Sequence, residues 1–173
     1  MQTLLPQGLP VEFESVSNVT ATNSVNLGEV RMVNGEEYLY VYNAGVQQIS
    51  QGQCAVLSAN SGFSVTVSSV TGYDYVIGFA KHATITTGGY GWLVTRGFTK
   101  VQNAMASTAL AVGDPIVVAG QGGVQGLNVS TTALCGNVGM LAAIGPLGVV
   151  VSACASGASA NSLAVAYVRC YGT

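Results

Sequence analysis

Short runs of β-branched and aromatic residues recur along this chain about every ten residues, separated by clusters of Gly, Ser, Asn and Asp. This spacing predicts an all-β fold with little helix, arranged as a single compact β-sandwich or β-barrel over residues 28–173. The expected strands are Gln53–Ser58, Phe63–Val70, Tyr75–Ala80, Tyr90–Thr95, Pro115–Ala119, Leu147–Ser152 and Leu163–Tyr171. The best helical stretches are Asn103–Leu110 and, more weakly, Thr131–Leu141.

Residues 1–27 differ from the rest of the chain. Pro6, Gly8 and Pro10 come first, and the polar run Ser15–Ser24 follows. This stretch shows no helical periodicity and only weak alternation of polar and apolar residues. We therefore expect an extended N-terminal arm or a peripheral strand of low independent stability, which needs a neighbouring molecule to order it.

The strongest local pattern is Asn34-Gly35, which lies between two alternating runs. A type I′ turn needs a positive φ at both central residues, so Asn-Gly at this place predicts a β-hairpin. Pairing across the turn separates an aliphatic face, expected in the core, from a face rich in tyrosine. The aliphatic residues are Val30, Met32, Leu39 and Val41, and the opposite face carries Arg31, Tyr38, Tyr40 and Tyr42.

The tyrosine face and the single tryptophan each have two interpretations. Tyrosine combines a large apolar area with a polar tip, so this face is either a second core layer or a contact surface. Trp92 is either a core anchor or an important residue of a subunit interface. Tyr38, Tyr40, Tyr42 and Trp92 are therefore the candidate contact residues of the chain.

Charge is scarce. Only 7% of the residues are charged and the formal net charge is −2, whereas soluble domains average roughly 25% charged residues. A free monomer of this kind would be poorly protected against association, so we expect partner subunits to cover much of its surface. The basic residues are spread along the sequence, too thinly to neutralise a run of phosphates, and nucleic-acid binding is not expected. They are Arg31, Lys81, Arg96, Lys100 and Arg169.

Membrane insertion and export are not expected either. The stretch Val138–Ala155 is apolar and long enough to span a bilayer, but it contains three glycines and Pro146 and has no flanking basic residue. Met1–Pro10 lacks the basic start and apolar core of a secretory signal.

Residues for catalysis or for holding a cofactor or metal are also scarce. His82 is the only histidine, and we interpret it as a polar residue at a strand end rather than as a base or metal ligand. Most of the seven carboxylates lie in the arm or beside expected turns, as Asp114 does. The cysteines form no CxxC pair, and reduced buried thiols are favoured over a disulfide. They are Cys54, Cys135, Cys154 and Cys170. We expect no enzymatic activity and no cofactor.

Three segments and the C-terminal run resemble small capsid decoration, or cement, proteins of tailed bacteriophages. The segments are Val76–Ala80, then Gly89–Val94 with Gly97, and then Leu110–Ile116 before Gly120. The run Leu163–Cys170 is similar to the closing strand of such proteins. These residues cover about the middle half of the chain and its end, and they are turn and strand residues that carry no chemistry.

The resemblance implies a virion protein that binds the exterior of an assembled capsid, in the host cytoplasm, as a homotrimer. Its partner would be the major capsid protein, whose neighbouring subunits it would bridge and so stabilise by mass action. The arm and the tyrosine face would make the contacts. The alternatives are another virion subunit, such as a major capsid, tail-tube or head-fibre protein, and a carbohydrate-binding β-sandwich.

Overall fold

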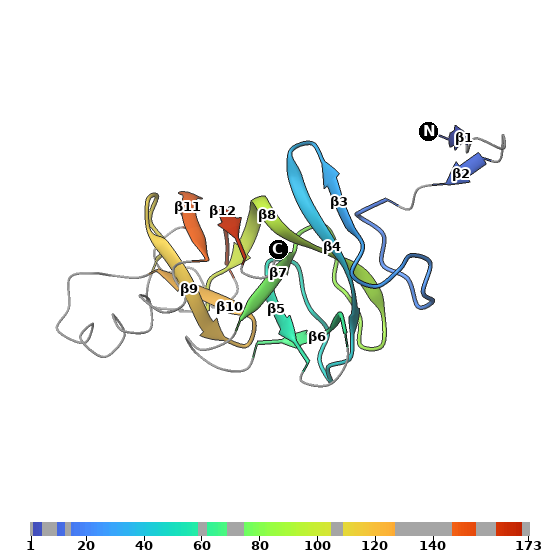
Figure 1. Cartoon of the computed structure of the whole chain (residues 1–173). Coiled ribbons are helices and arrows are strands. Elements are labelled where there is room, and N and C mark those ends of the chain that lie inside the picture. The colour runs from blue at the N-terminus through green and yellow to red at the C-terminus, as the bar shows by residue number, and fades with distance from the viewer. Residues whose placement is uncertain are drawn as a thin grey trace.

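The computed structural model describes residues 2–4, 10–12, 15–58, 62–68, 75–104, 109–126, 147–154 and 162–170. All regular secondary structure in these residues is β-strand, which confirms the all-β expectation. The strands are β1 (Gln2–Leu4), β2 (Pro10–Glu12), β3 (Val30–Val33), β4 (Glu36–Asn43), β5 (Cys54–Leu57), β6 (Ser64–Val67), β7 (Val76–Ala80), β8 (Tyr90–Gln102), β9 (Pro115–Gly120), β10 (Gly123–Gly126), β11 (Gly148–Ser152) and β12 (Leu163–Arg169). Figure 1 shows β3–β12 gathered into one body, with β1 and β2 set apart from it.

Asn34 and Gly35 form the turn between β3 and β4, as the sequence predicts. Their φ angles are 52° and 80°, the positive values that a type I′ turn requires. Val30 pairs with Leu39 and Val33 pairs with Glu36. The hairpin is confirmed in the expected register.

Five strands close into a small barrel. β8 pairs with β4 and β7, β7 pairs with β5, and β5 pairs with β6. A parallel pairing of β6 with β4 completes the ring. Aliphatic side chains from these strands fill the interior: Leu39, Val41, Ala55, Val65, Val67, Ile77 and Leu93. Of the two architectures left open by the sequence, this half of the molecule adopts the barrel.

The long strand β8 belongs to both halves of the molecule. Its second part, from Arg96 to Gln102, pairs with the whole of β12. From β12 the sheet continues through β11 and β9 to β10. A bridge between Asn103 and Val124 brings the chain after β8 back against β10. A second core lies between these strands, and its members include Val101, Ile116, Val118, Val124, Val150, Ala166 and Val168.

Two strands of the body, β8 and β10, differ most from the expectation. β8 continues well beyond its expected end at Thr95, because Arg96 to Gln102 pair with β12, past Gly97 with its φ of 132°. β10 lies next to a glycine-rich turn and is not predicted at all. The cluster of glycines around this segment predicts a loop, because glycine is typical of turns. Pairing with β9 nevertheless makes the segment a strand.

The helical expectations are only partly covered by the described residues. Asn103 and Ala104, at the start of the first stretch, lie in a bridge and in irregular structure. Residues 105–108 and the whole second stretch, Thr131–Leu141, lie outside the described residues.

Three of the four cysteines are buried as thiols, as expected. Cys54, Cys154 and Cys170 belong to the core that includes β12 and β11. Cys135 lies outside the described residues.

The expected aliphatic core face is correct for β4 and wrong for β3. Leu39 and Val41 are buried in the barrel, but Val30 is 51% exposed and Met32 is 62% exposed. The reason is that β3 lies outside the closed ring, at the end of the sheet, where it pairs with β4 alone among the described strands.

The N-terminal residues fall into two parts. β1 and β2 pair with each other in a separate two-stranded sheet. Residues 15–27 instead lie against the body, where Thr20 bridges to Tyr90 and the side chains of Val16 and Val25 pack on the core. Part of the expected arm therefore covers the barrel of its own chain.

Candidate functional site

Three of the four candidate contact residues are buried inside the chain. Tyr38, Tyr40 and Trp92 are at most 4% exposed and belong to one core cluster. The rings of Tyr40 and Trp92 lie 4.9 Å apart. Tyr42 is only partly buried and packs on Tyr90 at 4.9 Å. In the folded chain, Tyr38, Tyr40 and Trp92 are core residues, and their side chains are not exposed for contact with another molecule.

Residues 15–27 cover the tyrosine face of β4 at Tyr40. The hydroxyl groups of Ser24 and Thr20 lie 3.2 and 3.4 Å from the Tyr40 hydroxyl and satisfy its polar tip. On β3, the guanidinium of Arg31 lies 4.5 Å from the centre of the Trp92 ring. A cation at this distance over an aromatic face is attracted to it, which favours a fixed Trp92. The segment that the sequence assigns to the arm thus supplies the cover.

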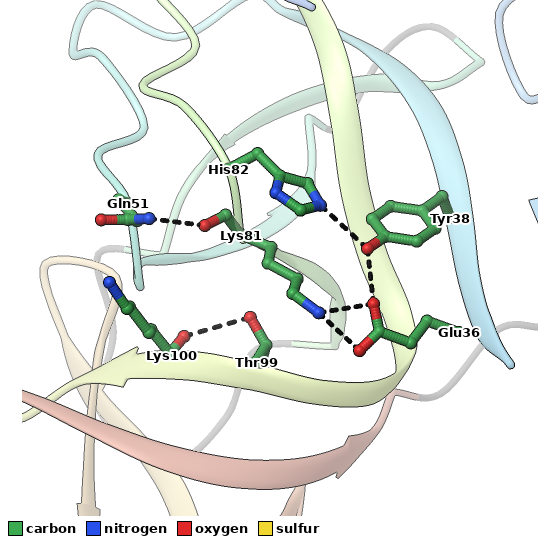
Figure 2. Close-up of polar contacts among 7 residues, drawn as sticks. All are labelled: Glu36, Tyr38, Gln51, Lys81, His82, Thr99 and Lys100. Atoms are coloured by element: carbon green, nitrogen blue, oxygen red, sulfur yellow. Dashed lines mark hydrogen bonds and ion pairs between the residues drawn. The ribbon is translucent and has the colours of Figure 1, made fainter. Parts of the chain in front are cut away.

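A polar cluster connects the β3–β4 hairpin to the chain after β7 (Figure 2). Lys81 donates to both carboxylate oxygens of Glu36, each at 2.5 Å. Tyr38 donates to Glu36 Oε2 at 2.6 Å, and its hydroxyl lies 3.0 Å from His82 Nε2. The Tyr38 and His82 rings are stacked with centroids 5.7 Å apart. Glu36 and Tyr38 therefore form one connected network with Lys81 and His82, which lie about 45 residues further along the chain.

The network shifts the pKa values of three of its members. Burial raises the pKa of Glu36, but hydrogen bonds from Lys81 and Tyr38 and the charge of Lys81 outweigh it, so this pKa lies below its ordinary value. Burial and the adjacent Glu36 carboxylate raise the pKa of Tyr38. Burial and the charge of Lys81 lower the pKa of His82. At neutral pH the cluster is an ion pair beside a neutral phenol and a neutral imidazole.

The arrangement is suited to holding two elements together. The proton of Tyr38 and the charge of Lys81 are both directed at the Glu36 carboxylate, so the polar groups satisfy one another. His82, which the sequence shows without a companion, has one in Tyr38. We interpret the cluster as a clamp between β4 and the end of β7.

A second group of side chains lies on the outer surface of β8, β12 and β11. Phe98 on β8 is opposite Tyr167 on β12, and Tyr167 is opposite Val149 on β11. Arg96 is directly opposite Arg169. We call this surface the basic face, formed by Arg96, Phe98, Lys100, Leu163, Tyr167, Arg169 and Val149.

The basic face is exposed and apolar between its charges. Phe98 is 52% exposed and Tyr167 is 38% exposed, with their rings 5.2 Å apart in an edge-to-face arrangement. Arg96 Nε donates to the Tyr167 hydroxyl at 3.5 Å. Three of the five basic residues of the chain lie on this one surface. In sequence they look scattered, because β8 and β12 are about sixty residues apart and only their antiparallel pairing brings the cations together.

A third surface surrounds β3. Val30 and Met32 are exposed on this strand, and Leu27 lies just before it. Phe63, also exposed, packs on the backbone of Gly28, where an added Cβ would lie 2.0 Å from its ring. We call Leu27, Val30, Met32 and Phe63 the β3 edge surface. An apolar edge strand is a site at which another chain can pair.

Among the described residues, no three His, Cys, Asp or Glu side chains gather in a way that could hold a metal ion. Within the same residues, no helix has the length and apolar character needed to cross a membrane.

Comparisons with known proteins find a similarity among solved structures. No family model and no curated protein matches the chain. Among solved structures, it is similar to the head fibre gp8.5 N base of bacteriophage phi29, with 10% sequence identity and a TM-score of 0.46. The match covers 76% of this chain and 93% of the phi29 chain. This similarity assigns no function to any residue of the chain.

Proposed function

We propose that this chain is a non-enzymatic structural protein of a tailed-bacteriophage virion. It binds the exterior of the assembled capsid as a homotrimer and stabilises the shell by bridging neighbouring major capsid subunits. The observation that carries the proposal is the β3 edge surface, four large apolar side chains exposed on and beside an edge strand. Large apolar side chains exposed on and beside an edge strand are a feature of protein interaction sites.

Two further features support an assembling protein. The low charge content leaves a free monomer with little protection against association. The resemblance of Val76–Ala80, Gly89–Val94 and Leu110–Ile116 to cement proteins falls on β7, β8 and the approach to β9, in the framework of the fold. A cement role needs a contact with the shell and a contact between copies, and the described residues offer an exposed apolar surface for each, the β3 edge surface and the basic face.

Shell stabilisation follows from mass action. A protein that binds the assembled shell but not its free subunits lowers the free energy of the assembly at each filled site. An edge strand adds backbone hydrogen bonds to the apolar contact, which gives such a site both affinity and orientation.

The test is electron cryomicroscopy of particles that carry this protein, compared with particles assembled without it. We expect extra density on the outer surface between neighbouring capsid subunits. Density that projects as a fibre would favour the head-fibre alternative, the class of the phi29 chain. Density within a continuous shell or tail tube would make the chain a principal subunit, and absence from particles combined with glycan binding would favour the carbohydrate-binding alternative.

A matched pair of variants tests the surface itself. Val30→Ser with Met32→Ser is expected to lower the occupancy of particles at a fixed protein concentration. Val46→Ser with Val112→Ser is the control, because both of these valines are highly exposed elsewhere. If both variants occupy the particles equally, the β3 edge surface does not make the contact with the shell.

A further inference from the structure

The cations of the basic face form no close ion pair with a carboxylate among the described residues. Ion pairs in this part of the chain join Arg31 to Glu29 and Lys81 to Glu36. Arg96, Lys100 and Arg169 form none there, and Arg96 lies directly opposite Arg169. Like charges facing each other across two strands are unfavourable, so the face is suited to an acidic group from outside.

The described carboxylates of the same chain are engaged elsewhere. Glu29 and Glu36 are in the ion pairs just named, and Glu37 accepts a hydrogen bond from Thr95 at 2.6 Å. Asp114 accepts from the backbone of Ala111 at 2.8 Å. Glu37 attracts Arg96 across β4 and β8, but it lies at one end of the basic face.

The apolar part of the face narrows the choice of partner. Phe98, Tyr167 and Val149 form a row across three strands, with cations before and after it along β8. Aromatic residues and arginine are enriched in the centres of protein interfaces. A fitting occupant therefore carries carboxylates and apolar side chains together. The same face of a second copy is excluded, because it would place arginine against arginine.

The N-terminal segment of the chain has that composition. Residues 1–14 contain Glu12 and Glu14, no basic side chain, and the apolar residues Leu4, Leu5, Leu9, Val11 and Phe13 among others. Within this segment, β1 and β2 are three-residue strands, and among the described strands each pairs only with the other. An isolated two-stranded hairpin is at best marginally stable in water, so it needs a surface to pack on.

The segment is placed to reach another molecule. Figure 1 shows β1 and β2 beyond the body, at the opposite end from β11 and β12. We propose that the acidic N-terminal segment of one copy docks on the basic face of a second copy, head to tail. Such a heterologous contact closes into a ring when the rotation between copies permits it, and a trimer is one such ring.

The test is the mass of the full-length chain in solution, measured by sedimentation without any particles. Three variants are compared with the wild type: Arg96→Glu with Arg169→Glu, Glu12→Arg with Glu14→Arg, and all four changes together. The fourfold variant keeps the formal net charge of −2. A control, Gln47→Glu with Gln48→Glu, adds two negative charges at exposed positions away from the face.

We expect the wild type to form oligomers that dissociate as the salt concentration rises. Each two-residue reversal on the face or the segment is expected to weaken association at least about tenfold, and the fourfold variant to restore it. Circular dichroism would confirm that each variant is folded. The control is expected to associate like the wild type.

Three results would overturn the inference. They are a wild type that stays at 17.5 kDa in low salt, reversals that associate as well as the control, and a fourfold variant that remains monomeric. Binding to particles is measured in a separate experiment. A negative result for the contact between copies therefore does not contradict the proposed contact with the shell, and a negative result for the shell does not contradict the contact between copies.

Discussion

At the scale of single residues, the structure separates aromatic side chains that hold the fold together from those that face outward. Trp92 and Tyr40 lie in the core, where residues 15–27 and Arg31 cover them. Phe98 and Tyr167 lie on the opposite side of their strands, in solvent. In the sequence, the buried and the exposed aromatic residues look alike, because both kinds lie in or near expected strands. Only the placement of the strands in the fold distinguishes them.

Truncation of Trp92 tests this division. Trp92→Ala is expected to lower the free energy of unfolding by about 3–5 kcal/mol, because it removes a large buried side chain and leaves a cavity. The matched control is Tyr75→Ala, since Tyr75 is 68% exposed, and its effect is expected within about 0.5 kcal/mol. Urea denaturation followed by circular dichroism measures both. A Trp92→Ala protein as stable as the control would contradict the core assignment.

The polar cluster predicts how stability depends on pH. The pKa of Glu36 is lowered in the fold, so its contribution is present above the unfolded value of 4.5 and is lost as the pH falls below it. The pKa of His82 is also lowered, so the unfolded chain takes up its proton first, and stability falls as the pH drops below 6.5. Both groups therefore destabilise the fold on acidification, in two successive ranges.

Two substitutions separate these ranges. His82→Gln is expected to remove the loss of stability that begins near pH 6.5, and Glu36→Gln the loss that begins near pH 4.5. Glu36→Gln also leaves Lys81 without its carboxylate and is expected to be less stable than the wild type at neutral pH. Melting temperatures across the acidic range measure both effects. Profiles parallel to that of the wild type would show that the clamp does not titrate as described.

At the scale of elements, Gly35 and Gly97 have different structural roles. Gly35 has a φ of 80° and open space around it, so it serves only the turn. Gly97 has a φ of 132° in the middle of β8, and an added Cβ would lie 2.8 Å from Glu36 Cγ. Gly97 is the first residue of β8 beyond the pairing with β4, where the strand passes from the barrel to the second half of the molecule.

Alanine substitutions at these two glycines are expected to differ in size. Gly35→Ala is expected to cost about 1–2 kcal/mol, the penalty of a left-handed conformation for a residue with a Cβ. Gly97→Ala is expected to cost more, because the methyl group also displaces the side chain that binds Lys81. Chemical denaturation gives both values. A smaller loss at Gly97 than at Gly35 would argue against close packing of Gly97 on Glu36.

At the scale of the whole molecule, the boundary between arm and body differs from the one expected at residue 27. Residues 15–27 are part of the folded body, since Thr20 pairs with Tyr90 and Val16 and Val25 pack on the core. The separate sheet of β1 and β2 lies before this segment.

Two truncations test this boundary. Removal of residues 1–14 is expected to change the melting temperature little and to abolish self-association. Removal of residues 1–27 is expected to destabilise the fold by several kcal/mol, because it uncovers the Tyr40 hydroxyl and part of the core. Thermal unfolding and sedimentation of both proteins measure these effects. If the two truncated proteins are equally stable, residues 15–27 belong to the arm and not to the folded body.

The sequence by itself determines the strands and the first hairpin. Alternation of polar and apolar residues and the chemistry of turns act over a few neighbouring residues, so Asn34-Gly35 and most strand positions are local properties. The candidate contact residues were less predictable. Tyr38, Tyr40 and Trp92 lie in strands whichever interpretation is correct, and no local pattern says which segment covers them.

Only the tertiary structure decides which faces are covered and which residues meet. The closed ring buries β4 on both sides and leaves β3 outside it, so Leu39 is in the core while Val30, its partner across the hairpin, is exposed. The pairing of β8 with β12 gathers Arg96, Lys100 and Arg169, and the approach of the β7 end to β4 gives His82 its companion. These contacts join residues far apart in the chain. The free energy that selects them comes from closing the barrel and burying its side chains, which is a property of all the strands together.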